Sequence, residues 1–167
     1  MLFVCARAGE FSQQQFQVLR QNRNLTGEEV VSTFKGSCLC GQVTYEIEGE
    51  TMAFFHCHCS RCRKSSGTGH ASNVRVQANK INWTKGEALV KSYKVPEAQR
   101  FITVFCSQCG SALPRHFPSH GFVILPAGTL DTALEISPQG RIFNTSRASW
   151  SCQDDLPVHD EYPVQTK

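Results

Sequence analysis

The fold is decided by the stretch Phe101-Ile102-Thr103-Val104-Phe105-Cys106-Ser107-Gln108-Cys109-Gly110, in which a β-branched and aromatic run ends in a C-x-x-C turn. The run predicts a strand that lies in the core. The turn can aim two sulfurs at one ion, and Gly110 supplies the permissive φ needed where the chain turns away. A shorter version of this turn, Cys38-Leu39-Cys40-Gly41, precedes a second strand-like segment. The two turns together predict one closed site.

Cys38, Cys40, Cys106 and Cys109 are the four expected ligands of that site. Four thiolates complete a tetrahedral zinc shell, and structural zinc contributes on the order of 10 kcal/mol to folding. We therefore expect a structural ion that ties distant parts of the chain together. Two alternatives stay open: Cys38 and Cys40 as buried apolar thiols, and iron in place of zinc.

The middle cluster, Cys57-His58-Cys59-Ser60-Arg61-Cys62, differs because it has three sulfurs and no fourth cysteine nearby. Catalytic zinc sites keep one coordination position open in this way. Three thiolates on Zn²⁺ leave a net charge of about −1, and a soft thiol suits such a metal better than a neutral oxygen ligand does. Bound thiol would be deprotonated at neutral pH. Cys57, Cys59 and Cys62 are thus the predicted holders of a catalytic zinc, which makes two zinc ions per chain.

Basic residues surround this cluster. Arg61, Arg63 and Lys64 can offset its negative charge and attract a substrate that carries carboxylates. The alternative is a solvated basic loop. Arg61 and Lys64 are predicted substrate contacts.

Two histidines flank Cys57. In an extended segment His56 and His58 point to one side and Cys57 to the other. We therefore favour a hydrogen-bonding or acid/base role for His58 over metal ligation, with a packed or exposed histidine as the plain alternative. His56 and Cys152 remain possible fourth ligands, Cys152 only if the tail folds back.

The remaining pattern is mainly β. Val43, Tyr45 and Ile47 alternate with polar residues, as in a strand with one buried face. Further strands are expected near residues 89–95 and 121–125, and prolines at 114, 118 and 126 exclude long helices there. We expect residues 1–33 to be a weakly ordered N-terminal extension, 34–157 a zinc-binding domain and 158–167 a C-terminal tail.

Composition limits the partners and the compartment. A net charge of +3 over 167 residues is too small for the basic footprint of a nucleic-acid binder. No run approaches the roughly 20 apolar residues of a membrane span, and no signal-peptide pattern opens the chain. Nine cysteines in clusters indicate metal binding in a reducing compartment rather than a secreted disulfide scaffold. We expect a cytoplasmic protein that binds neither nucleic acid nor membrane.

With these residues in hand, the chain resembles the glutathione-dependent formaldehyde-activating enzyme family, whose domain is also called the centromere-protein-V type. The resemblance covers about residues 34–157. It rests on Gly36-Ser37-Cys38-Leu39-Cys40-Gly41-Gln42-Val43-Thr44-Tyr45, His56-Cys57-His58-Cys59-Ser60-Arg61-Cys62-Arg63-Lys64, Phe105-Cys106-Ser107-Gln108-Cys109-Gly110-Ser111, Ala127-Gly128-Thr129-Leu130-Asp131, Ile142-Phe143, Ser146-Arg147-Ala148-Ser149-Trp150 and Asp155-Leu156-Pro157. The surroundings of the three-cysteine cluster and the C-terminal region differ from the formaldehyde-activating members, so the resemblance is to the broader family.

The resemblance implies a β-tent of several small curled antiparallel sheets, similar to type B methionine sulfoxide reductases. It implies the same division of metals, with a structural and a catalytic zinc. The family activity is carbon–sulfur bond making and breaking, with S-(hydroxymethyl)glutathione as the named product of formaldehyde detoxification. Thr129 and Asp131, in the matched loop, are candidate substrate contacts.

The leading hypothesis is a zinc-dependent carbon–sulfur lyase whose partner is a glutathione-like thiol or its adduct. His58, Ser65 or Ser66 could relay a proton because they lie close in sequence, and Ser65 is also a predicted substrate contact. One rival is a non-catalytic zinc-stabilised module that binds a protein. A second rival, a redox pair at Cys59 and Cys62, is disfavoured because such pairs normally stand at a helix N-terminus beside a βαβ pattern, and neither is expected here.

Overall fold

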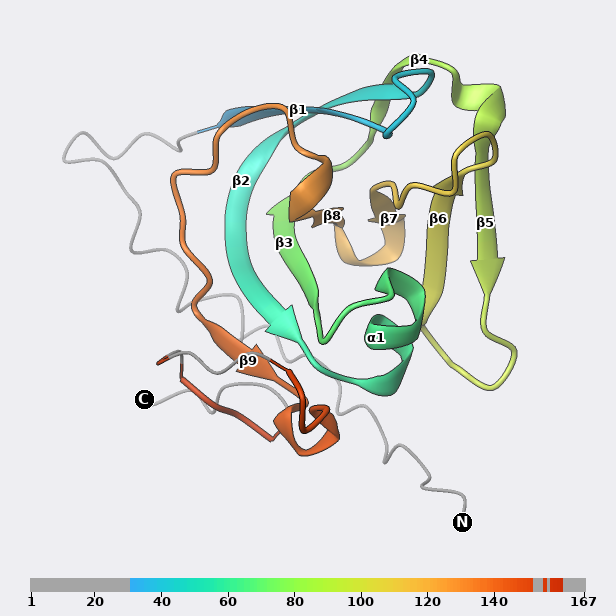
Figure 1. The fold of residues 1–167 in the computed structure, drawn as a ribbon. Helices are drawn as coiled ribbons and strands as arrows, with labels where there is room; N and C mark the ends of the chain where they lie inside the picture. The colour runs from blue at the N-terminus through green and yellow to red at the C-terminus, as the bar shows by residue number, and fades with distance from the viewer. Residues whose placement is uncertain (1–30, 152–154, 156, 161–167) are drawn as a thin grey trace, which may run out of the picture. The chain divides into compact units, whose positions relative to one another are not determined.

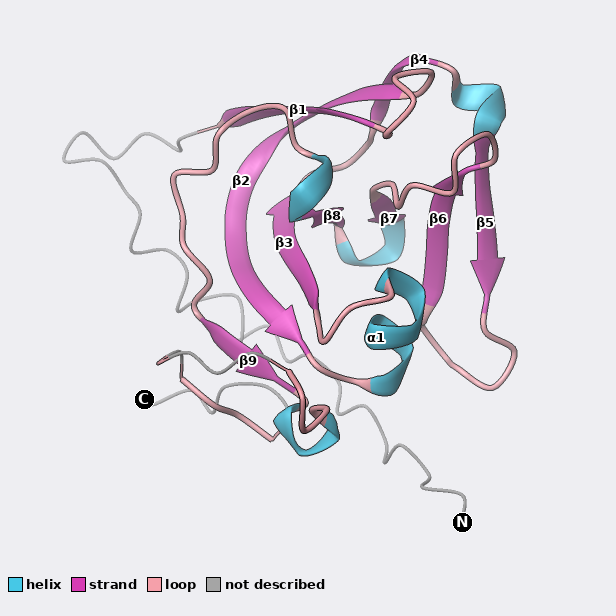
Figure 2. Ribbon diagram, in the orientation of Figure 1, coloured by secondary structure: helices cyan, strands magenta, loops and turns pink. Residues whose placement is uncertain are grey.

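One long strand, β2 (Thr44–Cys57), organises the computed structural model, which describes residues 31–151, 155 and 157–160 (Figure 1). Strands dominate these residues, with one short α-helix and four single-turn 3₁₀ helices (Figure 2). The other strands are β1 (Ser32–Ser37), β3 (Ala71–Gln77), β4 (Asn82–Lys85), β5 (Val90–Lys94), β6 (Ile102–Cys106), β7 (Arg115–Phe117), β8 (Phe122–Pro126) and β9 (Gly140–Ile142). The helices are α1 (Ser60–Ser66), η3 (Glu87–Leu89), η4 (Pro118–His120), η5 (Ala127–Thr129) and η6 (Asn144–Ser146).

β2 is sharply curved and joins the two halves of one seven-stranded sheet (Figure 1). Its first half pairs with β1 and β4, and its second half pairs with β3 and β9. The pairing with β3 shifts register between Thr51 and Ala53, and such a bulge bends a strand. The sheet continues from β3 through β8 to β7, while β5 and β6 form a separate ladder. The predicted fold class, mainly β with curled antiparallel sheets, is confirmed; β9 alone among the described strands pairs in parallel.

The main core lies between the halves of this curved sheet. Tyr45 and Ile47 of β2 are buried, as their alternation predicts. They pack with the inward residues of β3 and β8, which are Val74, Val76, Val123 and Leu125. The strand predicted near residues 121–125 is β8 and the one near 89–95 is β5.

The prediction that residues 101–105 lie in the core is wrong. The stretch forms β6 as expected, but its residues before Cys106 are only partly buried. The reason is the pairing, because β6 joins β5 in a two-stranded ladder whose outer strand is largely exposed. Cys106 is fully buried at the end of β6.

Helix α1 was not expected. It begins directly after Cys59, whose sulfur accepts from the Cys62 N–H at 3.4 Å as an N-cap. It ends at Gly67 in the left-handed conformation (φ 69°), with the Gly67 N–H donating to the Arg63 carbonyl. In the second half of the described chain the helices are single 3₁₀ turns, as the prolines predict.

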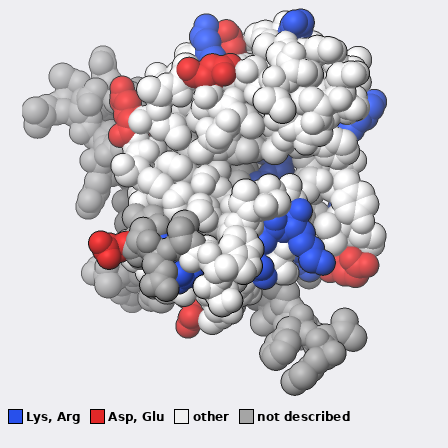
Figure 3. Space-filling view, viewed as in Figure 1, with Lys and Arg blue, Asp and Glu red and all other residues white. Residues whose placement is uncertain are grey.

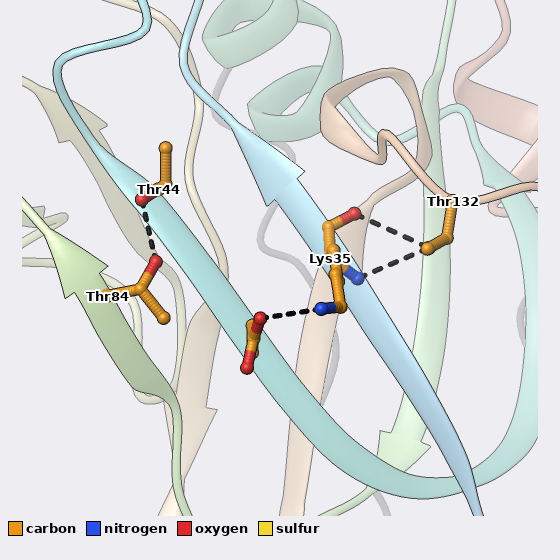
Figure 4. A network of polar contacts seen from close by, with 5 residues as sticks. Lys35, Thr44, Thr84 and Thr132 are labelled. Carbon is orange, nitrogen blue, oxygen red and sulfur yellow. Dashed lines mark hydrogen bonds and ion pairs between the residues drawn. The ribbon is translucent and has the colours of Figure 1, made fainter.

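An exposed polar network joins the strands at the start of the chain (Figure 4). Lys35 Nζ lies 2.9 Å from a Glu46 carboxylate oxygen, and the Lys35 backbone N–H donates to Thr132 Oγ1 at 3.2 Å. Thr44 and Thr84 share a hydrogen bond of 2.6 Å between β2 and β4. These contacts are solvated, so each adds little stability.

The predicted division into residues 1–33, 34–157 and 158–167 stays a prediction. Within the described residues β1 begins at Ser32, and the His159 N–H donates to the Arg141 carbonyl at 3.1 Å. The predicted extension lies almost wholly outside the described residues. Across the residues that are described, no helix has the length and apolar character needed to span a membrane.

We predict that Gly36→Ala destabilises the protein. An added Cβ at Gly36 would overlap the Tyr45 ring and the Thr129 backbone oxygen. Such overpacking costs about 1–3 kcal/mol. Denaturant unfolding of the metal-loaded protein measures the loss. Gly128→Ala is the matched control, because nothing lies within 4 Å of its added Cβ; an equal loss from both variants would contradict the packing argument.

Candidate metal centres

Cys38, Cys40, Cys106 and Cys109 come together, with their four sulfurs all within 4.8 Å of one another. The Cys38 and Cys40 sulfurs are 3.4 Å apart, and those of Cys40 and Cys106 are 4.0 Å apart. Sulfurs about 2.3 Å from a central zinc stand about 3.8 Å apart in a tetrahedron. The observed separations lie on either side of that value, so this four-cysteine site fits a tetrahedral ion.

Two similar turns place these sulfurs. The Cys38 N–H donates to the Val43 carbonyl at 3.0 Å, and the Cys106 N–H donates to the Ser111 carbonyl at the same distance. Gly41 and Gly110 then adopt positive φ values of 68° and 73°. The predicted need for glycine after each cysteine pair is thus confirmed.

The thiols of this site do not behave as four independent groups. Burial raises the pKa of Cys38, but the Val43 N–H and the neighbouring thiols outweigh it and lower that pKa to about 6. The Gln42 N–H lowers the pKa of Cys40, yet burial and its three sulfur neighbours raise it to about 11. Backbone N–H groups of Ser111 and Cys40 lower the pKa of Cys109. Gathering all four as thiolates therefore requires a cation.

Cys57, Cys59 and Cys62 form a second group with sulfurs within 4.8 Å of one another. Cys57 is the last residue of β2, Cys59 caps α1, and Cys62 lies in the first turn of that helix. Cys57 and Cys62 are buried, whereas Cys59 is partly exposed. This three-cysteine site thus faces outward at Cys59.

The described residues supply no fourth ligand to the three-cysteine site. Within residues 31–151, 155 and 157–160, neither His56 nor an acidic side chain joins the group. Cys152, the other fourth ligand considered, lies outside the described residues, as does Cys5. The described part of the site is an open, three-sulfur donor set of the kind that leaves a metal position free.

The three thiols of this group do not titrate independently. Hydrogen bonds from Cys57 and Cys62 hold the pKa of Cys59 well below its usual range. The same contacts, first that with Cys59, raise the pKa of Cys57 far above it. Cys57 lowers the pKa of Cys62, but Cys59 and burial outweigh it and raise that pKa to about 12. Three thiolates this close together repel one another unless a cation lies among them, so the group has the chemistry expected of a metal site.

Aromatic rings pack around the three-cysteine site. Phe55, Phe101 and Phe143 pack against the buried group formed by Cys57, Cys62 and Ile142. Phe143 has a positive φ of 55°, which is uncommon for an aromatic residue. Apolar walls exclude water and so strengthen electrostatic interactions within the site.

Arg115, which the sequence analysis missed, interacts electrostatically with all three of these cysteines. Burial lowers the pKa of its guanidinium, and the sulfurs of Cys62, Cys57 and Cys59 raise it again. The residue starts β7, more than 50 positions from the cluster. The two residues directly before it, Leu113 and Pro114, are buried and Arg115 itself is partly buried, but nothing in its sequence surroundings signals the cysteine cluster.

The basic residues that the sequence singled out lie on α1. Arg61 is partly buried and Lys64 is exposed. Basic side chains gather over α1, and further basic atoms lie in the hollow beside it toward β7 (Figure 3). Ser65 and Ser66 both donate to the Cys62 carbonyl, at 3.1 and 2.9 Å, so their hydroxyls already have partners within the helix. The predicted substrate contacts of Arg61, Lys64 and Ser65 stay predictions.

His58 is fully buried. Its Nδ1 lies 3.1 Å from the Gly69 carbonyl oxygen, and because a carbonyl only accepts, Nδ1 donates. The rings of His56 and His58 both contact the His70 ring, with centroids 4.2 and 5.2 Å apart. The prediction that these two histidines share one side is confirmed. The catalytic role of His58 stays a prediction.

Thr129 and Asp131 lie beside the four-cysteine site. Tyr45 Oη lies 2.8 Å from Thr129 Oγ1, and Ser37 Oγ donates to Asp131 Oδ1 at 3.1 Å. Both residues line a cavity of about 270 Å³ that Cys38 also borders. β2 runs from the neighbourhood of the four-cysteine site to Cys57 in the three-cysteine site. The described contacts of Thr129 and Asp131 are therefore at the four-cysteine end of β2. Their predicted role as substrate contacts stays a prediction.

The model of one protein family matches most of this chain. No curated protein matches the chain. The crystal structure of a Rhodobacter sphaeroides protein is similar, with 22% sequence identity over 60% of this chain and 91% of that one, and a TM-score of 0.46. The model of the family described as glutathione-dependent formaldehyde-activating enzyme matches residues 33–146, which contain both cysteine groups. The chain therefore belongs to the glutathione-dependent formaldehyde-activating enzyme family.

Proposed function

We propose that this protein is a zinc-dependent carbon–sulfur lyase that acts on a glutathione-like thiol or its adduct with a carbonyl compound. The observation that carries the proposal is the open three-sulfur donor set of Cys57, Cys59 and Cys62. Membership of a family named for glutathione and formaldehyde supports a thiol partner. A reducing compartment such as the cytoplasm suits a chain that uses seven thiolates as ligands.

A zinc ion held by the three cysteines would supply Lewis-acid stabilisation of a substrate thiolate. In the forward direction a bond forms between the thiol sulfur and the carbonyl carbon, and the thiol proton ends on the carbonyl oxygen. The reverse reaction breaks that bond and returns the proton to sulfur. Formaldehyde and glutathione would give S-(hydroxymethyl)glutathione.

The chain's own side chains have three tasks in this proposal. Cys57 and Cys62 are buried and fix the metal, while the partly exposed Cys59 marks the side from which substrate arrives. Phe101 and Phe143 keep water from the reacting sulfur. His58, with Nδ1 held by Gly69, is the candidate to hold the transferred proton at Nε2.

X-ray absorption at the zinc edge, with and without glutathione, tests the proposal. Seven cysteine sulfurs shared by two ions give an average of about 3.5 sulfurs per zinc, and a bound thiol raises this to about 4. S-methylglutathione is the matched control, because it keeps the peptide and lacks the thiol. An unchanged sulfur shell with glutathione would end the lyase proposal. A full shell without any thiol would instead favour a zinc-stabilised protein-binding module.

A further inference from the structure

We propose that Arg115 is a positioning residue of the three-cysteine site, and that its guanidinium is the counter-charge that allows this site to hold a metal–trithiolate centre. The inference rests on the proposed metal at Cys57, Cys59 and Cys62. It goes beyond the proposed reaction because it concerns how the site keeps its metal.

Strand register brings Arg115 to the same face of the sheet as Cys57. Cys57 pairs with Ala71, and two residues further along β3 stands Asn73. Arg75 pairs with Ile124 of β8, and Ile124 pairs in turn with Arg115 of β7. Paired residues and residues two apart in a strand point to one face.

Neutral groups hold the guanidinium in place. One terminal nitrogen of Arg115 donates to the Ile102 carbonyl at 3.3 Å, and the other donates to Asn73 Oδ1 at 3.1 Å. The guanidinium carbon lies 6.0 Å from the centre of the Phe101 ring, and Phe101 also packs against the buried cysteines. The charge is therefore oriented by two hydrogen bonds but neutralised by neither.

The cysteines are the negative groups available to this charge. Among the described residues, no carboxylate forms a salt bridge with Arg115. The groups that interact electrostatically with Arg115 are Cys57, Cys59 and Cys62. Three thiolates and Zn²⁺ carry a net charge of −1, and the guanidinium brings the total to zero. A partly buried charge is costly unless it is compensated, so each centre stabilises the other.

The basic residues of α1 do not replace it. Arg63 Nε donates to the His58 carbonyl at 3.2 Å, and Lys64 is exposed. Charges in water are screened, whereas a charge held against apolar walls is not. Arg61 is partly buried on the same helix, but the guanidinium that interacts with all three cysteine sulfurs is that of Arg115.

Zinc competition with a chelator tests the inference on purified protein that contains both metals. The phase that belongs to the three-cysteine site is identified by its loss in Cys59→Ser. Arg115→Gln keeps a hydrogen-bonding side chain and removes the charge; partners outside the ligand shell are worth about 10- to 100-fold in metal affinity, and we expect a loss of that size. Arg115→Lys restores the charge, so its zinc affinity at the three-cysteine site should stay within about threefold of that of the unchanged protein, well short of the 10- to 100-fold loss.

Two controls separate charge from folding. The four-cysteine phase in the same molecules should not change, and Arg100→Gln, at an exposed arginine, should leave both phases as they are. The inference is overturned if Arg115→Gln binds zinc normally, if Arg115→Lys loses as much as Arg115→Gln, or if both sites weaken together. No thiol enters this assay, so a failure of the lyase proposal alone would leave the zinc result standing.

Discussion

Cys106→Ser is expected to unfold the domain. Cys106 is fully buried, ends β6, and meets Cys40 across 66 positions of sequence in the four-cysteine site. Structural zinc contributes on the order of 10 kcal/mol, which equals or exceeds the net stability of most domains. Circular dichroism should show loss of the β signal at room temperature, and metal analysis should show loss of both ions.

The matched control for this variant is Ser107→Ala. Ser107 lies in the same turn, is exposed and is not a ligand. We expect it to melt within a few degrees of the unchanged protein, because surface substitutions usually change stability by about 0.5 kcal/mol or less. A folded Cys106→Ser protein with two zinc ions would rule out the structural role of this site.

Cys59→Ser is expected to abolish the proposed activity and to leave the fold intact. Serine keeps an oxygen at the N-cap of α1, where Cys59 now accepts from the Cys62 N–H, so the helix retains its cap. Loss of a ligand should exceed the 10- to 100-fold effect of a partner outside the shell, so the rate of adduct formation should fall by more than about 100-fold. Nuclear magnetic resonance of the hydroxymethyl adduct gives the rate, and metal analysis should count one zinc in place of two.

The two cysteine substitutions also test the division of roles against each other. Melting should separate them widely, because the four-cysteine site joins distant segments and the three-cysteine site joins residues within one short stretch. Equal losses of melting temperature would contradict that division. Full activity in Cys59→Ser would exclude the three-cysteine site as the place of reaction.

The pairs within each cysteine turn could be predicted because their information is local: spacing sets which sulfurs lie together, and Gly41 and Gly110 mark where the chain must turn with positive φ. The meeting of the two distant turns was predicted instead from the four thiolates that a closed zinc shell needs. The alternation of β2 was equally local and gave the correct buried face at Tyr45 and Ile47.

Other features depend on tertiary context, which spacing does not contain. The burial of residues 101–105 was overestimated because an apolar run has no information on whether a third strand will cover it. Helix α1 has only seven residues, too few for a hydrophobic period to stand out. A redox pair at Cys59 and Cys62 was disfavoured because neither a helix N-terminus nor a βαβ pattern was expected there. The first expectation was wrong, since Cys59 caps α1. The second holds, since the described sheets contain no βαβ unit.

Arg115 shows the same limit at the functional site. Its approach to Cys57 passes through three strand pairings, from β7 to β8, to β3 and to β2. None of these registers can be read from the arginine's own surroundings in the chain. The analysis of the sequence instead assigned the compensating charge to its nearest basic neighbours on α1.

The candidate metal sites near the two ends of β2 differ in the sequence separation of their cysteines. The four-cysteine site closes a loop of more than 60 residues, and that closure is part of folding itself. The three-cysteine site draws its ligands from six consecutive residues, so loss of its metal would open no such loop. If both sites hold zinc as proposed, the first ion would be coupled to folding of the chain, whereas the second could leave without unfolding it. A protein that lacked only the second ion would then keep its structure and lose the proposed reactivity.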